Sequence, residues 1–293
     1  MKMVVTGSKG QLGGTLQRQA EAQGHVVLGM DLPEHDFTKL GAMHATLHEF
    51  APDIIMHCGA YTDVDGAERN PDLAYRVNAL GPRNFAYYCQ AAGIPLMYFS
   101  TDWVFSAPPT RREPFREWEA LNPLCTYAKS KAAGEWYVQQ LLRQFYIVRG
   151  SWLFGAGGNN FIAKIIRAAD ERGSLSIVTD EISSPSWVDD ISTALLKLVS
   201  LPLPAYGTYH LPNDGYCSRF EYTAEILRLT GRGDVPLTET LLASYQRAAT
   251  PPQFSAITNF AAADLGITMR PWQEALAAYL ASLPPSTFAR VKE

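Results

Sequence analysis

The chain has 293 residues and a formal net charge of −4, with 25 Lys and Arg residues against 29 Asp and Glu residues. Apolar residues make up 47% of the sequence and charged residues 18%, which excludes general disorder, and the slight acidic surplus argues against nucleic-acid binding. Without about 18 consecutive apolar residues, and with four cysteines that lack metal-ligand spacing, the chain is expected to be a soluble, reduced, cytoplasmic protein with no transmembrane helix.

Short apolar runs alternate with helical patterns over the first 150 residues. We predict strands at residues 2–6, 25–30, 53–57, 95–99 and 145–149. Between them, the apolar spacing predicts helices at residues 11–23, 40–50, 71–92 and 127–144. This alternation is typical of parallel βαβ units with helices on both faces of the sheet. The predicted fold class is therefore α/β, a doubly wound parallel sheet of the Rossmann type, whose ligands lie beyond the carboxyl ends of the strands.

The regular alternation ends near residue 150. Short helical patterns at residues 160–172, 189–199 and 219–230 are separated by segments rich in Pro and Gly. We therefore divide the chain into a dinucleotide-binding domain over residues 1–150 and a smaller, mainly substrate-binding C-terminal region over residues 151–293. Part of this region is expected to complete the sheet of the first domain.

Three glycines at three-residue intervals, Gly7, Gly10 and Gly13, follow the first predicted strand and precede the first predicted helix. Glycine permits a tight turn there and lets backbone N–H groups approach a pyrophosphate. The spacing differs from G-x-G-x-x-G, and such glycines also occur in ordinary turns, but their position favours a dinucleotide site. Asp31 ends the second strand, where a carboxylate accepts hydrogen bonds from a ribose hydroxyl and favours NADH over NADPH. Alternatively, Asp31 is an ordinary loop or capping residue that does not contact a cofactor.

Tyr127 and Lys131 lie four residues apart in a predicted helix, which places their side chains on one face. A cation near a phenol lowers the pKa of tyrosine, which suits a general acid that protonates a substrate carbonyl oxygen. A Y-x-x-x-K pattern is also common by chance. Ser100, Thr101 and Asp102 end the fourth predicted strand, so these hydroxyl groups, the Tyr–Lys pair and the glycine loop all fall at the carboxyl edge of the sheet.

Together these motifs resemble the extended short-chain dehydrogenase/reductase family, and finer segments resemble the dTDP-4-dehydrorhamnose reductases within it. The segments that carry this finer resemblance are 59–68, Asn78, 100–105, 149–155, 158–161, Asp180 with Ser184-Pro185, Pro252 with Ser255, Leu265-Gly266 and Pro271-Trp272. The resemblance covers about residues 1–281. It implies reduction of the C4 ketone of a nucleotide-linked 4-keto-6-deoxyhexose with NADPH or NADH. The expected binding partner is then a nucleotide sugar, and binding to nucleic acid or to a membrane is not expected. The protein is expected to be a monomer or a homodimer.

The resemblance also implies roles for individual residues. Tyr127 would be the proton donor, Lys131 its electrostatic partner and a ligand of the nicotinamide ribose, and Thr101 a second hydroxyl on the substrate oxygen. Asp102 and Trp152 would contact the sugar. The residues implied in cofactor binding are Gly7, Gly10, Gln11, Leu12, Gly13, Asp31, Asp36, Phe37, Ala60, Tyr61, Thr62, Tyr127 and Lys131.

The sequence departs from the family pattern at a few positions. Trp103 stands where Tyr is more common, Gly150 where Thr is more common, and Thr250-Pro251 or the next pair where the family has Arg-Pro. These changes concern the sugar pocket, so the reaction type follows more firmly than the substrate. Thr15 stands where some relatives carry an acid that binds a metal between subunits, and no metal is expected.

Two other functions remain open from the sequence. One is an enzyme of the same fold with another task, such as an epimerase or a reductase for a different nucleotide sugar. The other is a regulatory subunit that binds NADP without catalysing a reaction. Retention of Thr101, Tyr127 and Lys131 together argues against the regulatory subunit, because binding alone would not require all three residues.

Overall fold

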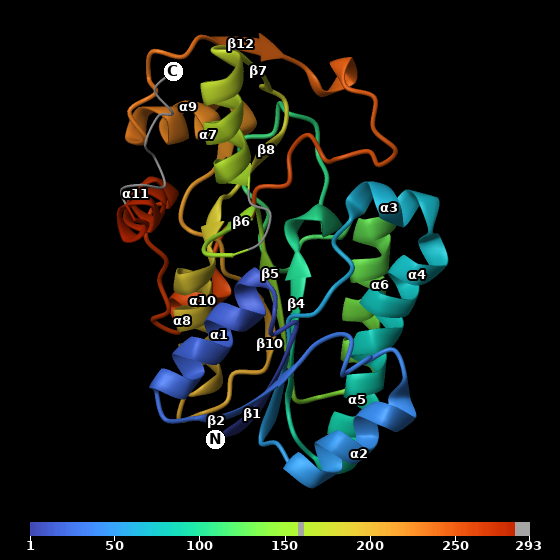
Figure 1. Ribbon diagram of the computed structural model, residues 1–293. Coiled ribbons are helices and arrows are strands. Elements are labelled where there is room, and N and C mark those ends of the chain that lie inside the picture. The colour runs from blue at the N-terminus through green and yellow to red at the C-terminus, as the bar shows by residue number, and fades with distance from the viewer. Residues whose placement is uncertain (158–160, 285–293) are drawn as a thin grey trace.

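A parallel sheet of six strands forms the centre of the computed structural model, which describes residues 1–157 and 161–284 (Figure 1). The strands are β1 (Lys2–Thr6), β2 (Val26–Met30), β3 (Ile54–His57), β4 (Leu96–Thr101), β5 (Phe145–Gly150) and β10 (Gly207–His210). Their spatial order is β10-β5-β4-β3-β1-β2, and every pairing is parallel. Strands β3 and β4 are buried along their whole length, as expected for a sheet covered on both faces. The predicted doubly wound α/β fold is confirmed.

Helices cover both faces of this sheet (Figure 1). One face carries α1 (Gln11–Ala22) and α8 (Val188–Val199), and the other carries α2 (Leu40–Phe50), α5 (Gly81–Ala92) and α6 (Thr126–Leu141). Each face has its own apolar core: Leu16 and Leu195 belong to the first, and Phe85 and Val138 to the second. Burying such a side chain stabilises the fold by about 1.5–3 kcal/mol. Each helix therefore packs the face that carries its regularly spaced apolar residues against the sheet.

The chain order of the sheet reverses between β1 and β3, because β2 and β3 lie on opposite sides of β1. Gly7 follows β1 with φ at +65°, and Gly59 lies shortly after β3. A Cβ atom on Gly7 would lie 2.9 Å from the Cα atom of Gly59, so only glycine fits this close crossing. Doubly wound sheets bind ligands where the strand order reverses, which directs attention to this edge.

The C-terminal region lies beyond the carboxyl ends of β4 and β5 (Figure 1). Its helices and strands are β6 (Leu153–Phe154), α7 (Phe161–Arg172), β7 (Leu175–Val178), β8 (Ile182–Ser183), β9 (Ser186–Trp187), β11 (Cys217–Ser218), α9 (Arg219–Leu229), β12 (Leu237–Thr240), the 3-10 turn η3 (Leu242–Ser244), α10 (Ala261–Asp264) and α11 (Trp272–Ser282). The strands form short pairs, β6 with β9, β7 with β12 and β8 with β11. Strand β10 and helix α8 belong instead to the sheet, and the predicted domain division near residue 150 stays a prediction.

The predicted helix over residues 71–92 is present, but it contains a turn that was not predicted. The structure has α4 (Pro71–Tyr75), a π-helical turn η1 (Arg76–Leu80) and then α5. Pro82 has no N–H group, so the carbonyl of Asn78 has no helical donor four residues ahead. The hydroxyl of Tyr98 donates to that carbonyl instead, at 3.0 Å. In this helix, Pro82 thus follows shortly after a π turn, and π turns are often found at functional sites.

Smaller differences concern the ends and number of elements. Helix α6 ends three residues before the predicted end, at Leu141, and two short helical segments were not predicted, α3 (Val64–Arg69) and the 3-10 turn η2 (Asp102–Val104). Positions 158–160, which include part of a family motif and the predicted start of the helix over residues 160–172, lie outside the described residues. Within residues 1–157 and 161–284, every helix is too short or too polar to cross a membrane.

Candidate active site

Tyr127 is the second residue of α6, and a carboxylate from α3 determines where this helix begins. Glu68 Oε1 accepts a hydrogen bond from the Thr126 N–H at 2.6 Å, and Glu68 Oε2 accepts one from the Thr126 hydroxyl at 2.8 Å. A carboxylate at a helix N-terminus satisfies an unpaired N–H group and opposes the positive end of the helix dipole. Glu68 thus fixes the turn that carries Tyr127, a role that was not predicted from the sequence.

The phenol of Tyr127 lies close enough to Thr101, the last residue of β4, for the Thr101 side chain to influence its pKa. Burial raises the pKa of Tyr127 well above its ordinary value, the Thr101 side chain opposes this change, and the charge of Asp102 adds to it. The predicted lowering of the Tyr127 pKa by Lys131 is therefore wrong for this arrangement. A neutral phenol is the form that donates a proton, so the raised pKa suits a general acid.

The ammonium of Lys131 is 2% exposed and points to the end of β4. Its Nζ donates to the carbonyl of Phe99 at 2.7 Å and lies 4.2 Å from the centroid of the Tyr98 ring. Burial lowers the pKa of Lys131 to about 7, and Glu135, four residues further along α6, is the strongest influence that raises it. The charge on Lys131 therefore depends on a neighbour one helical turn away.

Glu135 is itself held by a buried ion pair with Arg149 of β5. Arg149 Nε donates to Glu135 Oε1 at 3.0 Å and Arg149 Nη2 to Glu135 Oε2 at 2.6 Å, and both side chains are almost fully buried. Burying two charges costs desolvation energy that their attraction only partly returns, so such a pair is weak evidence for stability. Its position next to Lys131 instead supplies negative charge close to the ammonium. The four-residue spacing after Lys131 is the sequence signal that identifies Glu135.

Asn78 joins the loop after β3 to helix α6. Its side-chain oxygen accepts a hydrogen bond from the Tyr61 N–H at 2.8 Å, and its amide donates to the Tyr61 carbonyl at 3.1 Å and to the Ser130 hydroxyl at 3.0 Å. The predicted cofactor segment Ala60-Tyr61-Thr62 is thereby fixed one helical turn from Tyr127. Asn78 belongs to the family motif, but this clamp depends on the π turn and was not predicted.

The glycine loop packs closely enough that side chains would not fit. A Cβ atom on Gly13 would collide with the Gly7 carbonyl oxygen, and one on Gly10 would lie 3.2 Å from the same oxygen. No described side chain caps the start of α1 at Gly10, and the N–H groups of Gln11 and Leu12, in the first turn, have no acceptor within the helix. This is a cradle for an anion at a helix N-terminus, and it fits the pyrophosphate of a dinucleotide.

The side chain of Gln11 connects this loop with the C-terminal region. Its Nε2 donates to the carbonyl of Gly155 at 3.2 Å and to the carbonyl of Gly157 at 2.6 Å. Gln11 was predicted as a cofactor ligand, and its backbone still lies in the first turn of α1. The side chain, however, joins the two halves of the chain across the carboxyl edge of the sheet.

Both carboxylate oxygens of Asp31 accept hydrogen bonds from the backbone. Oδ2 accepts from the Lys9 N–H at 2.9 Å and Oδ1 from the Leu32 N–H at 2.8 Å. The ammonium of Lys9 pairs with Glu34 at 2.8 Å. Asp31 therefore holds the glycine loop against the end of β2, which agrees with the loop-residue alternative, while the predicted ribose contact stays a prediction.

Asp36 and Phe37 lie behind the loop that follows β3. The ring of Phe37 is buried against Gly59, where a Cβ atom would lie 2.8 Å from it, and it meets the His57 ring edge-on at 5.0 Å. Asp36 Oδ1 accepts from the Thr38 N–H and hydroxyl, and the hydroxyl bond lowers the pKa of Asp36. Phe37 thus packs against the start of the predicted cofactor loop. Direct contacts of Asp36 and Phe37 with the cofactor stay predictions.

Asp102 and Trp152, the predicted sugar contacts, lie where β4 and β5 meet the C-terminal region. Asp102 is 2% exposed, and its carboxylate accepts hydrogen bonds from serine hydroxyls. Trp152 has φ at +39°, in the left-handed region that non-glycine residues rarely adopt, and the Arg219 guanidinium lies 3.5 Å from its ring centroid. Such backbone strain often occurs at functional sites, but both sugar contacts stay predictions.

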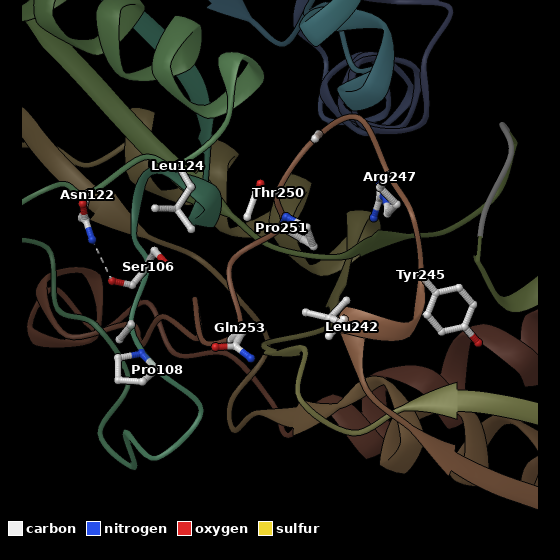
Figure 2. A pocket seen from close by; sticks show the side chains of 13 residues that line it. Ser106, Pro108, Asn122, Leu124, Leu242, Tyr245, Arg247, Thr250, Pro251 and Gln253 are labelled. Atoms are coloured by element: carbon white, nitrogen blue, oxygen red, sulfur yellow. Dashed lines mark hydrogen bonds between the residues drawn. The ribbon is translucent and has the colours of Figure 1, made fainter.

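A pocket of about 510 Å³ borders this site, between residues 106–124 and the segment 242–253 (Figure 2). Figure 2 shows Asn122 turned towards the Ser106 carbonyl, with Arg247 on the opposite wall. Ala249 lines the pocket and also belongs to the apolar cluster that includes Tyr127. Ala249 therefore connects the wall of the pocket with the packing around Tyr127. Within residues 1–157 and 161–284, no cluster of three His, Cys, Asp or Glu side chains could hold a metal ion.

These features define a class of protein. A doubly wound parallel sheet, a glycine cradle at the N-terminus of its first helix and a Tyr–Lys pair beside a hydroxyl at the same edge are the features of a short-chain dehydrogenase/reductase. The chain also matches, over residues 1–284, the family described as RmlD substrate binding domain. The chain therefore belongs to the RmlD substrate binding domain family.

Individual relatives agree with this assignment. The spore coat polysaccharide biosynthesis protein SpsK of Bacillus subtilis is 33% identical over 279 residues, 95% of this chain and 96% of that protein. A dTDP-4-dehydrorhamnose reductase of Mycobacterium tuberculosis is 34% identical over 290 residues, 98% of this chain and 94% of that enzyme. Among solved structures, the dTDP-4-dehydrorhamnose reductase of Bacillus anthracis in complex with NADP is 36% identical, with a TM-score of 0.91 over 96% of this chain and 99% of that one.

Proposed function

We propose that this protein is an NADPH- or NADH-dependent reductase that converts dTDP-4-dehydro-L-rhamnose, or a close nucleotide-linked 4-keto-6-deoxyhexose, to dTDP-L-rhamnose or its analogue. The observation that carries the proposal is the grouping of Thr101, Tyr127 and Lys131 at the carboxyl end of β4, where Thr101 influences the pKa of Tyr127 and the Lys131 ammonium donates to the Phe99 carbonyl at 2.7 Å. Family membership and relatives named dTDP-4-dehydrorhamnose reductase support the substrate class.

The nicotinamide cofactor supplies a hydride when it is bound. The residues that fit it are the glycine cradle for the pyrophosphate, the Ala60-Tyr61-Thr62 loop for the nicotinamide half, and Lys131 for the nicotinamide ribose. The cradle is suited to a phosphate because the first-turn N–H groups have no acceptor within the helix, and because Gly13 lets the start of α1 pack directly against the Gly7 carbonyl. The proposed site of action is the cytoplasm.

Tyr127 supplies the proton in this reaction. Its phenol holds the proton on Oη, because burial raises its pKa, and gives the proton to the ketone oxygen as the C4 carbon gains the hydride. The oxygen thereby becomes a hydroxyl, and the phenolate left on Tyr127 regains a proton from solvent. The hydroxyl of Thr101 is the second hydroxyl group that contacts the substrate oxygen.

A direct assay tests this function. Purified protein is mixed with NADPH or NADH and with a small panel of nucleotide-linked 4-ketosugars, and oxidation of the cofactor is followed by its near-ultraviolet absorbance. We expect oxidation with a 6-deoxy-4-ketohexose and none without sugar. Inversion of the sugar without net cofactor oxidation would show an epimerase. Cofactor binding with no reaction of any sugar would favour the regulatory subunit.

A further inference from the structure

The short helix α3 carries two carboxylates that the proposed mechanism does not use. Asp65 and Glu68 belong to the motif at residues 59–68, and they lie three residues apart, which brings their side chains to neighbouring positions on the helix. Glu68 binds the start of α6, and Asp65 binds a segment of the C-terminal region. Helix α3 therefore links these two parts of the chain.

The hydrogen bonds to Glu68 take the place of a side-chain cap on α6. Cys125 is the N-cap residue of α6, and in the part of the chain that the structure describes its side chain makes no capping hydrogen bond. The N–H group and the hydroxyl of Thr126 donate to Glu68 instead, at 2.6 and 2.8 Å. Because Tyr127 is the next residue, the position of its backbone depends on Glu68.

The other end of α3 follows the loop that is proposed to hold the nicotinamide half of the cofactor. Residues 60–62 form this loop, and Asp63 is the N-cap of α3, with its carboxylate accepting a hydrogen bond from an N–H group of the first turn at 2.8 Å. Because α3 has only six residues, it joins this loop to the start of α6 over a short distance. Asn78 connects the same loop with α6 at a second point.

Asp65 attaches the C-terminal region to the same helix. Its Oδ1 accepts a hydrogen bond from the Ala249 N–H at 3.0 Å, and its Oδ2 lies 3.4 Å from Nη2 of Arg247. Both members of this ion pair are partly exposed, so the hydrogen bond to Ala249 is the firmer contact. Ala249 is buried in an apolar cluster with Cys125, and the side chain of Tyr127 packs against this cluster. Asp65 thereby holds a residue that packs at the first turn of α6.

Reduction of a ketone depends on the relative position of two donors. The hydride must reach the carbonyl carbon and the proton must reach the oxygen bonded to it, and a misplacement of about 1 Å can cost about 10²-fold in rate. The loop at residues 60–62 lies on the hydride side of the proposed reaction, and Tyr127 is on the proton side. A rigid connection between them would therefore support catalysis.

We propose that Glu68 and Asp65 are positioning residues, and that α3 sets the place of Tyr127 relative to the nicotinamide loop. Glu68 acts by binding Thr126, and Asp65 acts by holding Ala249 at the same turn. This inference rests on the reductase function proposed above. It assigns neither carboxylate a contact with substrate or cofactor, because both act through Tyr127.

The first test compares two carboxylates that each accept two hydrogen bonds. Glu68→Ala releases the start of α6, whereas Glu225→Ala removes bonds from Arg228, at 2.8 and 2.7 Å, that lie within the single helix α9. We expect Glu68→Ala to lower kcat about 10-fold to 100-fold, with the KM for NADPH within about threefold because the glycine loop is unchanged. Glu225→Ala should retain the wild-type kcat. Glu68→Gln should recover kcat to within about fivefold, because its amide oxygen can still accept from the Thr126 N–H.

A solvent isotope effect separates positioning from a loss of stability. If Tyr127 is displaced in Glu68→Ala, transfer of its proton becomes slower relative to the other steps of the reaction. The ratio of kcat in ordinary water to kcat in heavy water should therefore rise above the wild-type value. A protein that is merely less stable would lose active molecules in both solvents alike, and this ratio would not change.

Two variants of Asp65 test the second contact. Asp65→Asn keeps an oxygen for the Ala249 N–H but loses the charge beside Arg247, and it should retain kcat within about twofold. Asp65→Ala removes both contacts and should lower kcat about threefold to tenfold, less than Glu68→Ala, because Asp65 acts only through the packing of Ala249. The double variant Asp65→Ala/Glu68→Ala should lose less than the product of the two separate losses, because both carboxylates act on one turn. The two Asp65 variants also serve if Glu68→Ala does not fold.

Amide exchange tests the attachment of α6 to α3 without any reaction. The Thr126 N–H lies in the first turn of α6 and has no acceptor within that helix, so its hydrogen bond to Glu68 is what slows its exchange with solvent. We expect Glu68→Ala to speed this exchange about tenfold or more, measured by mass spectrometry of short peptides that contain Thr126. Glu225→Ala should leave it unchanged.

Several results would overturn the proposal. An unchanged kcat in Glu68→Ala, or a lowered kcat with the wild-type solvent isotope effect, would show that Glu68 does not position Tyr127. Equal losses in Asp65→Asn and Asp65→Ala, or fully multiplicative losses in the double variant, would remove Asp65 from this role. If the wild-type protein reduces no nucleotide ketosugar, the proposed function fails. Amide exchange then decides separately: faster exchange at Thr126 in Glu68→Ala would uphold the attachment of α6 to α3, and unchanged exchange would overturn it as well.

Discussion

Glu135 and Asp102 are buried carboxylates in two regions next to the Tyr–Lys pair, and each region compensates its carboxylate differently. On α6, both carboxylate oxygens of Glu135 accept hydrogen bonds from the guanidinium of Arg149. Where β4 meets the C-terminal region, Asp102 has only hydroxyl partners among the described residues, and burial raises its pKa to about 6. A guanidinium places a permanent positive charge beside its carboxylate, whereas hydroxyls donate hydrogen bonds without a charge.

The same contrast extends to the surroundings of each carboxylate. The sheet half places charged and ionisable groups around the reacting atoms, with Lys131 beside Glu135. In the C-terminal region, the ring of Trp152 packs against the guanidinium of Arg219. We therefore expect substitutions of Tyr127 and Glu135 in the first region to change kcat, and substitution of Trp152 in the second region to change recognition of the sugar. Each prediction below tests that division.

The largest effect is expected for Tyr127→Phe in the sheet half. Loss of the phenol should lower kcat by about 10²–10⁴, because Tyr127 is the proposed general acid that protonates the ketone oxygen. NADPH affinity, measured by fluorescence titration, should not change. Tyr87→Phe, an exposed tyrosine on α5, is the control and should retain full activity. Turnover of Tyr127→Phe within threefold of the wild type would contradict the role of Tyr127.

The next effect is expected for Glu135→Gln. It leaves the charge of Arg149 buried and unpaired, which should cost about 3–5 kcal/mol of unfolding free energy in urea titrations. It also removes the strongest influence that raises the pKa of Lys131, so the ammonium should lose its proton at a lower pH than the wild-type value of about 7. Activity that requires the charged lysine should therefore fall at lower pH on the alkaline side.

The control for this prediction is Glu119→Gln. Glu119 pairs with Arg111 at 2.8 Å, but both side chains are partly exposed, so the loss should be below about 1 kcal/mol. The groups that face Lys131 from other elements are His57, Cys58 and Tyr98, and none of them is altered in Glu135→Gln. An unchanged melting temperature and pH profile for Glu135→Gln would remove the distinction between the two carboxylates.

A smaller effect is expected for Trp152→Ala in the C-terminal region. If the indole forms a wall of the sugar pocket, the ketosugar KM should rise about tenfold, which corresponds to about 1.4 kcal/mol, with an unchanged KM for NADPH. The melting temperature should fall by only a few degrees, because the side chain is only partly buried. Normal kinetics with strong thermal destabilisation would show that Trp152 packs the two regions together and does not contact the sugar.

The smallest effect is expected for Asp31→Ala, at the edge of the sheet half. Removal of the carboxylate should weaken NADH binding a few-fold, by roughly 1 kcal/mol, and weaken NADPH binding less, because it removes a ribose contact from NADH and a repulsion from the 2′-phosphate of NADPH. Dissociation constants for both cofactors measure this. An equal loss for both would show that Asp31 only fastens the glycine loop through the N–H groups of Lys9 and Leu32.

Local patterns were enough to predict the fold and part of the site. The alternation of apolar runs, the glycine spacing and the four-residue interval between Tyr127 and Lys131 all express constraints within one strand, one turn or one helix. The carboxyl edge of a parallel sheet then brings these motifs together by topology alone. The sequence itself therefore determined the doubly wound fold, the glycine loop at the N-terminus of α1 and the positions of Tyr127 and Lys131 at the carboxyl edge of the sheet.

Only the tertiary structure decided what surrounds those residues. The Asn78 clamp depends on a π turn whose free carbonyl is met by Tyr98, from the next strand. The carboxylate of Asp102 is bound by Ser183 and Ser255, which lie 81 and 153 residues further along the chain. No local period records such pairings, because burial, hydrogen-bond direction and pKa arise only when distant segments exclude water from one another.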